Sequence, residues 1–176
     1  MSLFPKRMVY GYCFYRQETI YCTYKMRKNI QKTGINLTST ELTAPCGINC
    51  RLCRAYVREK KPCPGCRGWN DNKSPSCINC RIKNCETLVK NNLKYCFACG
   101  EFPCARLAHL DWRYRTRYAV SVIDNLLDIK EIGIRKFVEI ENIKWKCPEC
   151  GAMICMHKPE CLSCGYAWHL IPVLNN

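Results

Sequence analysis

Cysteine is the residue type whose number and spacing in this chain can do chemistry. The sequence holds 18 cysteines among 176 residues, against three histidines. Most of them form C-x-x-C pairs, the spacing at which two thiolates chelate one metal ion. A disulfide scaffold of this density needs a secretory route, and the first residues, MSLFPKRMVYGYCFYRQ, lack the apolar core and cleavage site of a signal peptide. We therefore expect metal ligation in a cytoplasmic protein.

The strongest motif lies near the C-terminus. Cys147-Pro-Glu-Cys150 and Cys161-Leu-Ser-Cys164 are each followed directly by glycine, and ten residues separate the two pairs. Zinc takes four soft ligands in a tetrahedron, and two C-x-x-C elements supply them. The glycines suit the tight turn that closes each knuckle. The pattern resembles a zinc ribbon or a rubredoxin-like site, so we predict one metal centre on these four thiols.

A second, richer group of cysteines lies in the centre of the chain. Its eleven members are Cys46, Cys50, Cys53, Cys63, Cys66, Cys77, Cys80, Cys85, Cys96, Cys99 and Cys104. All eleven are predicted metal ligands. Eleven is one short of three four-cysteine sites, so two sites with three spare thiols and three sites with one other ligand both remain open. The C-x2-C-x4-C spacing that starts at Cys77 recurs at Cys96, which is consistent with two similar knuckles.

Four other residues near the cysteines are candidate ligands or bases. His109 follows Cys104 by five residues and is the candidate twelfth ligand, although a lone helical histidine is more often exposed or structural. Glu101, between Cys99 and Cys104, is the carboxylate best placed to reach a metal, but we expect it to cap or to face solvent. Between the two C-terminal knuckles, we expect Cys155 to be buried or free and His157 to lie on the surface.

The metal identity is the main chemical alternative. Thiolate-only sites suit zinc and also iron–sulfur clusters. The glycine-terminated knuckles favour zinc, whereas the opening Cys46-x3-Cys50-x2-Cys53 and the scarcity of histidine favour a [4Fe–4S] cluster in the central region. The same opening matches the spacing of radical S-adenosylmethionine enzymes, but the strand–helix alternation of their barrel is missing from the sequence. We expect zinc, with the cluster as the alternative.

The central motifs resemble a family. The chain reads Thr43-Ala-Pro-Cys-Gly-Ile-Asn-Cys-Arg-Leu-Cys53, then Cys63-Pro-Gly-Cys-Arg-Gly68, then Tyr95-Cys-Phe-Ala-Cys-Gly-Glu-Phe-Pro-Cys104. This order is similar to that of an uncharacterised cysteine-rich family of bacteria and archaea, a domain of unknown function. Residues 125–133, Asn-Leu-Leu-Asp-Ile-Lys-Glu-Ile-Gly, and the closing C-P-x-C-G extend the likeness to about residue 166. The resemblance implies metal binding by these cysteines and implies no reaction.

The formal net charge of +14 suggests nucleic acid as a partner, but most of it disappears on metal binding. A divalent ion with four thiolates carries two negative charges, so four such sites would cancel eight positive ones. The remaining positive charge is concentrated in residues 1–40, which contain seven lysines and arginines and a single acidic residue, Glu18. In the segment 111–118, we expect Tyr114 and Tyr118 to pack into a core while Arg113 and Arg117 form a solvated face. Nucleic acid is therefore the weaker alternative to a protein partner.

The composition divides the chain into four regions. Residues 1–40 are a basic, tyrosine-rich extension, and residues 41–104 are a cysteine-rich domain with too few apolar residues for a conventional core. Residues 105–142 carry apolar residues at helical spacing interrupted at Gly133, which predicts two helices in a hairpin. Residues 143–176 are the ribbon-like domain. The predicted class is a small, metal-stabilised α+β protein, and no apolar run is long enough to span a bilayer.

The sequence favours a binding module over an enzyme. It contains no glycine-rich phosphate loop, paired-carboxylate motif or serine nucleophile elbow. We expect closed metal sites that fix a rigid surface, with Trp69, Phe97, Phe102 and Trp112 as exposed aromatic anchors for a partner protein. The alternatives are an iron–sulfur redox or cluster-delivery protein and a nucleic-acid-binding zinc protein.

Overall fold

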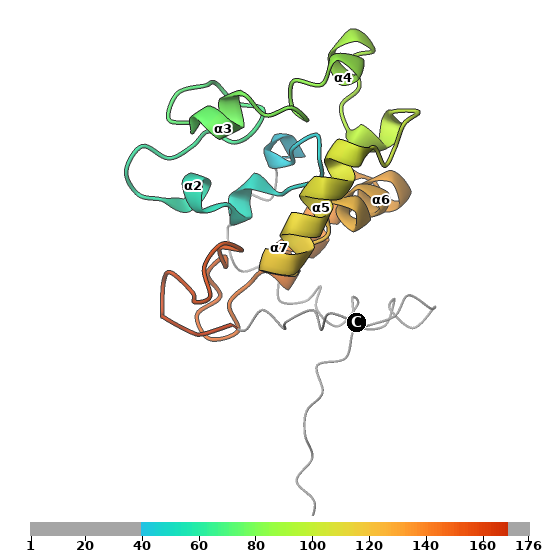
Figure 1. Ribbon diagram of the computed structural model, residues 1–176. Helices are drawn as coiled ribbons and strands as arrows, with labels where there is room; N and C mark the ends of the chain where they lie inside the picture. The colour runs from blue at the N-terminus through green and yellow to red at the C-terminus, as the bar shows by residue number, and fades with distance from the viewer. Residues whose placement is uncertain (1–39, 169–176) are drawn as a thin grey trace, which may run out of the picture. The chain divides into compact units, whose positions relative to one another are not determined.

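The computed structural model describes residues 40–168, and the predicted extension 1–40 lies almost entirely outside them (Figure 1). Short helical turns connected by loops form the cysteine-rich part. They are η2 (Thr40–Leu42), η3 (Cys50–Leu52), α2 (Arg54–Val57), α3 (Pro75–Ile78), α4 (Glu86–Lys90) and η4 (Cys96–Ala98). Three longer helices follow, α5 (Ala105–Tyr118), α6 (Val122–Ile132) and α7 (Ile134–Lys144).

The predicted hairpin of two helices is wrong, because the chain turns once more than expected. Helix α5 ends at Tyr118, and the next residue, Ala119, caps it in a left-handed conformation with φ of 50°. Helix α6 then starts at Ser121, whose side chain accepts a hydrogen bond from the backbone N–H of Asp124. Gly133 separates α6 from α7, as its position in the sequence predicts. The region therefore forms three helices.

Asp111 holds the turn between α5 and α6. Its carboxylate is buried, and it accepts hydrogen bonds from Arg115 Nε at 2.6 Å, from the Ser121 hydroxyl at 2.9 Å and from the Ile123 N–H at 3.0 Å. Burial acts to raise the pKa of Asp111, but these hydrogen bonds outweigh it and lower the pKa below its ordinary value. The carboxylate thus ties the end of one helix to the start of the next.

The larger hydrophobic cluster joins the cysteine-rich loops to the three helices. Helices α5, α6 and α7 contribute Leu107, Val122, Leu126, Ile129, Phe137 and Val138, and the cysteine-rich part contributes Ala44, Cys46, Cys50, Leu88, Tyr95 and Cys96. The cysteine-rich part contributes few large apolar side chains, as the composition predicts. These side chains pack against helices α5, α6 and α7. The helices are therefore the platform on which the central cysteines are placed.

A second cluster anchors the C-terminal segment. It consists of Leu52, Val120, Trp145, Cys147, Ile154, Met156 and Cys161. The N–H of Met156 donates to the carbonyl oxygen of Leu52 at 2.9 Å, which fixes the segment directly against the cysteine-rich loops. Tyr114 and Tyr118 pack at the edge of this cluster with ring centroids 5.2 Å apart, while Arg113 and Arg117 are exposed. The predicted aromatic and basic faces of this helix are confirmed.

The β component is smaller than the predicted α+β class requires. Within residues 40–168 it consists of three isolated antiparallel bridges, Thr43 with Asn49, Lys146 with Met153, and Glu160 with Ala167. Each bridge closes a short cysteine-bearing loop, and loops this short leave no room for a longer ladder. The described part of the chain is thus a small helical structure. None of its helices is long and apolar enough to cross a membrane.

Candidate metal centres

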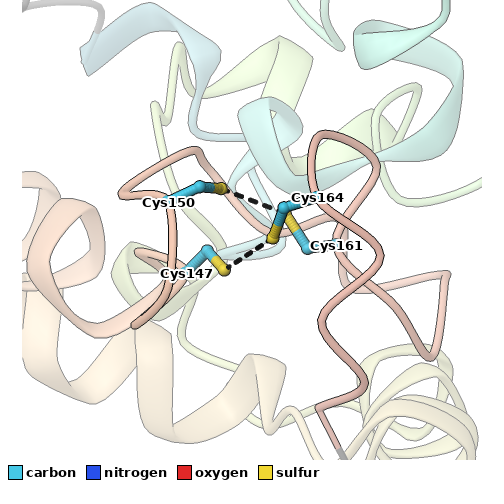
Figure 2. A group of neighbouring side chains, drawn as sticks. All are labelled: Cys147, Cys150, Cys161 and Cys164. Atoms are coloured by element: carbon cyan, nitrogen blue, oxygen red, sulfur yellow. Dashed lines mark hydrogen bonds between the residues drawn. The ribbon is translucent and has the colours of Figure 1, made fainter.

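The four C-terminal cysteines converge on one point, as their spacing predicts (Figure 2). The sulfurs of Cys147 and Cys164 are 3.6 Å apart, those of Cys150 and Cys161 are 3.7 Å apart, and all four lie within 4.8 Å of one another. Four thiolates at about 2.3 Å from a tetrahedral zinc ion lie about 3.8 Å from each other. The four thiols are therefore positioned to bind a single metal ion.

The two knuckles that carry these thiols have the same backbone hydrogen bonds. The N–H of Cys147 donates to Ala152 O at 2.8 Å, and the N–H of Gly151 donates to Cys147 O at 2.9 Å. Fourteen residues later, Cys161 donates to Tyr166 O and Gly165 to Cys161 O at the same two distances. The glycines have φ of 73° and 74°, which favours residues without a Cβ. Local sequence thus shapes each half of the site independently.

The protein around the four thiols already favours deprotonation at one of them. Hydrogen bonds from the backbone N–H groups of Cys164 and Ser163 lower the pKa of Cys161 to about 7. Cys147 and Cys161 are buried, whereas Cys150 and Cys164 are exposed. One side of the site therefore faces the second hydrophobic cluster and the other faces solvent, which gives a metal ion a route of entry.

Cys155 and His157 lie outside this set of four. Cys155 is fully buried, in agreement with the prediction, and burial raises its pKa. His157 is only half exposed, against the expectation of a surface residue. Its Nδ1 accepts a hydrogen bond from the N–H of Arg54 at 3.2 Å, and its ring packs on that of Tyr118 at 4.6 Å. The histidine thus connects the C-terminal segment to helix α2.

The first central cysteines sit in a tight loop supported by helix α6. Cys46 and Cys50 are buried, and burial raises the pKa of Cys50 to about 12. The sulfur of Cys50 accepts a hydrogen bond from the N–H of Cys66 at 3.2 Å, which brings two of the predicted motifs together. The Asn125 side chain donates to Gly47 O at 3.0 Å. These two hydrogen bonds hold the loop against Cys66 and helix α6.

Most of the remaining central cysteines lie at or next to the ends of helices. Cys53 precedes α2, Cys85 precedes α4, and Cys104 precedes α5, each at the N-cap position. Cys77 lies in α3, Cys80 follows that helix, Cys63 is buried in the loop after α2, and Cys96 and Cys99 bound η4. The third cysteine of each predicted C-x2-C-x4-C knuckle, Cys85 and Cys104, thus has the same structural role.

The central thiols are farther apart than those of the C-terminal site. Among residues 40–168, no other set of three or more cysteine, histidine or carboxylate groups has all its ligand atoms within 4.8 Å. The sixteen cysteines of this part of the chain are all free thiols. His109 is exposed and its ring lies near that of Trp112, away from such a set. The assignment of the eleven central cysteines as metal ligands stays a prediction.

Several central thiols are nevertheless close electrostatic neighbours. Burial, together with the nearby thiols of Cys104, Cys85 and Cys99, raises the pKa of Cys96 to about 12. Hydrogen bonds from the backbone N–H groups of Leu88 and Thr87 lower the pKa of Cys85, and the charge of Arg106 lowers it further. A group of thiols that raise one another's pKa is stabilised when a cation takes the place of their protons.

The fold and the sites define a small, cysteine-rich helical protein with thiols positioned for metal. Residues 42–109 match the model of a family described as a protein of unknown function, DUF3795. The expected resemblance to an uncharacterised cysteine-rich family is thereby confirmed for this segment, which holds all eleven central cysteines and ends within α5. No curated protein and no solved structure matched the chain.

Sequence reasoning missed two features of the site region. It treated the two C-terminal knuckles as a ligand pattern and did not infer that the backbone bonds of one recur in the other. The recurrence of C-x-x-C-G after fourteen residues was the available signal. It also assigned Phe97 and Phe102 as exposed anchors, but both are partly buried against the larger cluster. Trp69 and Trp112, at 83% and 65% exposure, do face solvent.

Proposed function

We propose that this protein is a non-enzymatic zinc-binding module that presents a metal-braced surface to a partner protein. The observation that carries the proposal is the convergence of Cys147, Cys150, Cys161 and Cys164 at single-ion distances. Four thiolates saturate a tetrahedral ion, so no coordination position is left for water or substrate. A catalytic zinc keeps such a position open, so a closed set supports a structural role.

The surroundings of the four thiols support the same conclusion. Cys147 and Cys161 belong to the second hydrophobic cluster together with Trp145. A metal ion there would link residues 145–168 to the helices and loops that this cluster contacts. Structural zinc contributes on the order of 10 kcal/mol to folding in small metal-dependent domains. The ion would therefore act on the fold of the whole C-terminal segment.

The proposed partner surface carries two exposed aromatic side chains. Trp69 and Trp112 are large aromatic side chains that the described fold leaves in solvent, and tryptophan is enriched among residues that dominate protein interfaces. The exposed Arg113 and Arg117 lie on the same helix as Trp112, α5. A nucleic-acid partner remains the alternative, because bases stack on exposed aromatic rings and phosphates bind arginine.

The test of the zinc assignment uses the full chain with two cysteine variants from the same segment. Cys164→Ala removes one exposed thiol of the converging set, and Cys155→Ala removes a thiol that lies outside it. Cys164→Ala should lose about one zinc ion per chain, and Cys155→Ala should keep it. Cobalt substitution provides a second readout, because cobalt bound by four thiolates gives the intense visible bands of a tetrahedral site.

Two results would contradict the proposal. An unchanged zinc content in Cys164→Ala would show that the converging thiols do not hold the ion. A six-coordinate cobalt spectrum, or turnover that depends on the metal of this site, would show that the site is open. Equal affinity of wild type and a Trp69→Ala/Trp112→Ala double variant for single-stranded nucleic acid would weaken the nucleic-acid alternative.

A further inference from the structure

A small cavity lies between α4, η4 and the start of α5, and four cysteines line it. They are Cys85, Cys96, Cys99 and Cys104. The cavity has a volume of about 30 Å³, and its walls are completed by apolar side chains that include Ile82, Leu88 and Leu107. A space of this size can hold a small inorganic group. Four soft ligands around one such space are the coordination set of a metal centre.

The fold brings these thiols together from separate parts of the sequence. Cys85 is the N-cap of α4, Cys96 and Cys99 bound η4, and Cys104 is the N-cap of α5. The N–H of Cys96 donates to Pro45 O at 2.9 Å, and that of Cys99 donates to Cys96 O at 3.0 Å. Because backbone bonds fix η4 and helix starts fix the other two residues, the four cysteines have defined positions around the cavity.

The grouping differs from the one that the spacing alone favours. Two equal knuckles would place Cys77, Cys80 and Cys85 at one site and Cys96, Cys99 and Cys104 at another. The cavity instead takes Cys85 from the first set and leaves Cys77 and Cys80 outside its wall. This division gives a complete set of four thiols, where the equal division would give three and three.

The separation of the sulfurs indicates which kind of centre fits. A single tetrahedral ion needs its four sulfurs about 3.8 Å apart, and the C-terminal thiols meet that condition. In the described chain, no three of the cavity thiols lie mutually within 4.8 Å. A cluster of iron and sulfide places its own atoms between the cysteine sulfurs, so it holds them farther apart than one ion does. The wider set therefore suits a polynuclear centre.

The charges at the cavity are also suited to such a centre. A [4Fe–4S] cluster with four thiolates carries a net negative charge in its common oxidation states. The exposed residues Arg81, Arg106 and Glu101 border the cavity with two positive charges and one negative charge, and their charged groups lie outside its apolar wall. Cys104 also lies at the N-terminus of the 14-residue helix α5, where the helix dipole stabilises negative charge. The surroundings thus offset the charge that a cluster would introduce.

We propose that Cys85, Cys96, Cys99 and Cys104 ligate an iron–sulfur cluster in this cavity, as a centre separate from the zinc site at Cys147–Cys164. The chain would then hold one redox-inert ion and one centre that can accept an electron. This inference does not depend on the zinc assignment, because the two centres share no ligand. It assigns a role in electron transfer or cluster delivery to the central domain.

The experiment uses the full chain purified without oxygen, with iron, acid-labile sulfide and zinc counted per chain. Cys99→Ala removes a half-buried ligand of the proposed cluster, and Cys164→Ala serves as its reciprocal control at the other centre. Cys99→Ala should lower iron and sulfide by about four each and leave zinc unchanged. Cys164→Ala should lower zinc by about one and leave iron and sulfide unchanged.

A third variant keeps the proposal testable if Cys99→Ala does not fold. Arg106→Gln removes a positive charge at the cavity from an exposed position. It should shift the midpoint potential of the cluster to a more negative value, because the reduced, more negative state loses its neighbour. Wild type without iron, Cys99→Ala with its full iron content, or Arg106→Gln with an unchanged potential would each overturn the proposal. The zinc content of Cys164→Ala tests the C-terminal site separately, so none of these three outcomes changes what it shows about that site.

Discussion

Gly47 connects the first cysteine loop to helix α6, and replacing it with alanine should be costly for two separable reasons. Its φ is 86°, a conformation that costs an alanine about 1–2 kcal/mol. An added Cβ would also lie 2.8 Å from the carbonyl oxygen of Val122 and 3.0 Å from Cγ of Leu126. Overpacking of this kind costs about 1–3 kcal/mol. Gly47→Ala should therefore lower the free energy of unfolding by about 2–5 kcal/mol.

Two further glycines separate these contributions. Gly133 has φ of 80° but nothing within 4 Å of its added Cβ, so Gly133→Ala carries the backbone strain without the contact. Gly100 has neither feature, and Gly100→Ala should stay within about 0.5 kcal/mol of wild type. Urea unfolding of the metal-replete chain at constant pH measures all three. The reasoning fails if Gly47→Ala lowers the free energy of unfolding by no more than Gly100→Ala does.

The same assay checks three further changes. Asp111→Ala should cost about 1–3 kcal/mol, because it leaves the Ile123 N–H and the Ser121 hydroxyl without their acceptor, and a cost below about 1 kcal/mol would contradict the role of the carboxylate. Burial raises the pKa of Glu141 above 4.5, so the folded state favours the protonated acid, and wild type loses stability as pH rises through that raised pKa. The amide oxygen of Glu141→Gln can still accept from Trp145 Nε1, so the free energy of unfolding of this variant should rise relative to that of wild type as pH increases from about 4.5 to 7. A stability difference between the two proteins that does not vary with pH would contradict the raised pKa. Removal of all metal by a strong chelator should abolish the dispersed amide spectrum of the cysteine-rich loops, since their apolar content is sparse, and a spectrum that survives verified metal removal would count against metal-dependent folding.

The C-terminal site was predictable from sequence because its geometry is local. Each C-x-x-C-G knuckle closes on its own backbone, as the paired bonds from Cys147 to Ala152 and from Cys161 to Tyr166 show. To bring the four ligands of two such knuckles together, the fold only has to place the two knuckles next to each other. Residue spacing therefore carries most of the information that the site requires.

The break between α5 and α6 was missed for an equally physical reason. Ala119 occupies the left-handed position, and alanine is the strongest helix former, so propensity argues against a turn there. The available signal was Ser121 followed three residues later by Asp124, an arrangement typical of a helix N-terminus. Continuous apolar spacing across the turn concealed it, because both helices face the same core.

The grouping of the central thiols was out of reach because it depends on contacts between distant segments. The bond from the Cys96 N–H to Pro45 O spans 51 residues, and no local sequence pattern predicts the bond from the Asn125 side chain to Gly47 O. Spacing favours the equal division at Cys77 and Cys96, while the packing of α4 and α5 puts Cys85 with the later set. Ligand type is thus a property of sequence, and ligand grouping is a property of the fold.

The two proposed centres should respond differently to air, which tests the separation of their chemistry in unmodified protein. Zinc has no redox chemistry, so oxygen should leave the C-terminal ion in place. Cys85, Cys99 and Cys104 are only half buried, so oxygen can reach a cluster in their cavity and oxidise it. Exposure of anaerobically purified protein to air should bleach its visible absorption and release iron, while the zinc content stays constant. Visible absorption that persists in air, or zinc lost in step with iron, would show that the two sets of thiols do not form independent centres of these two kinds.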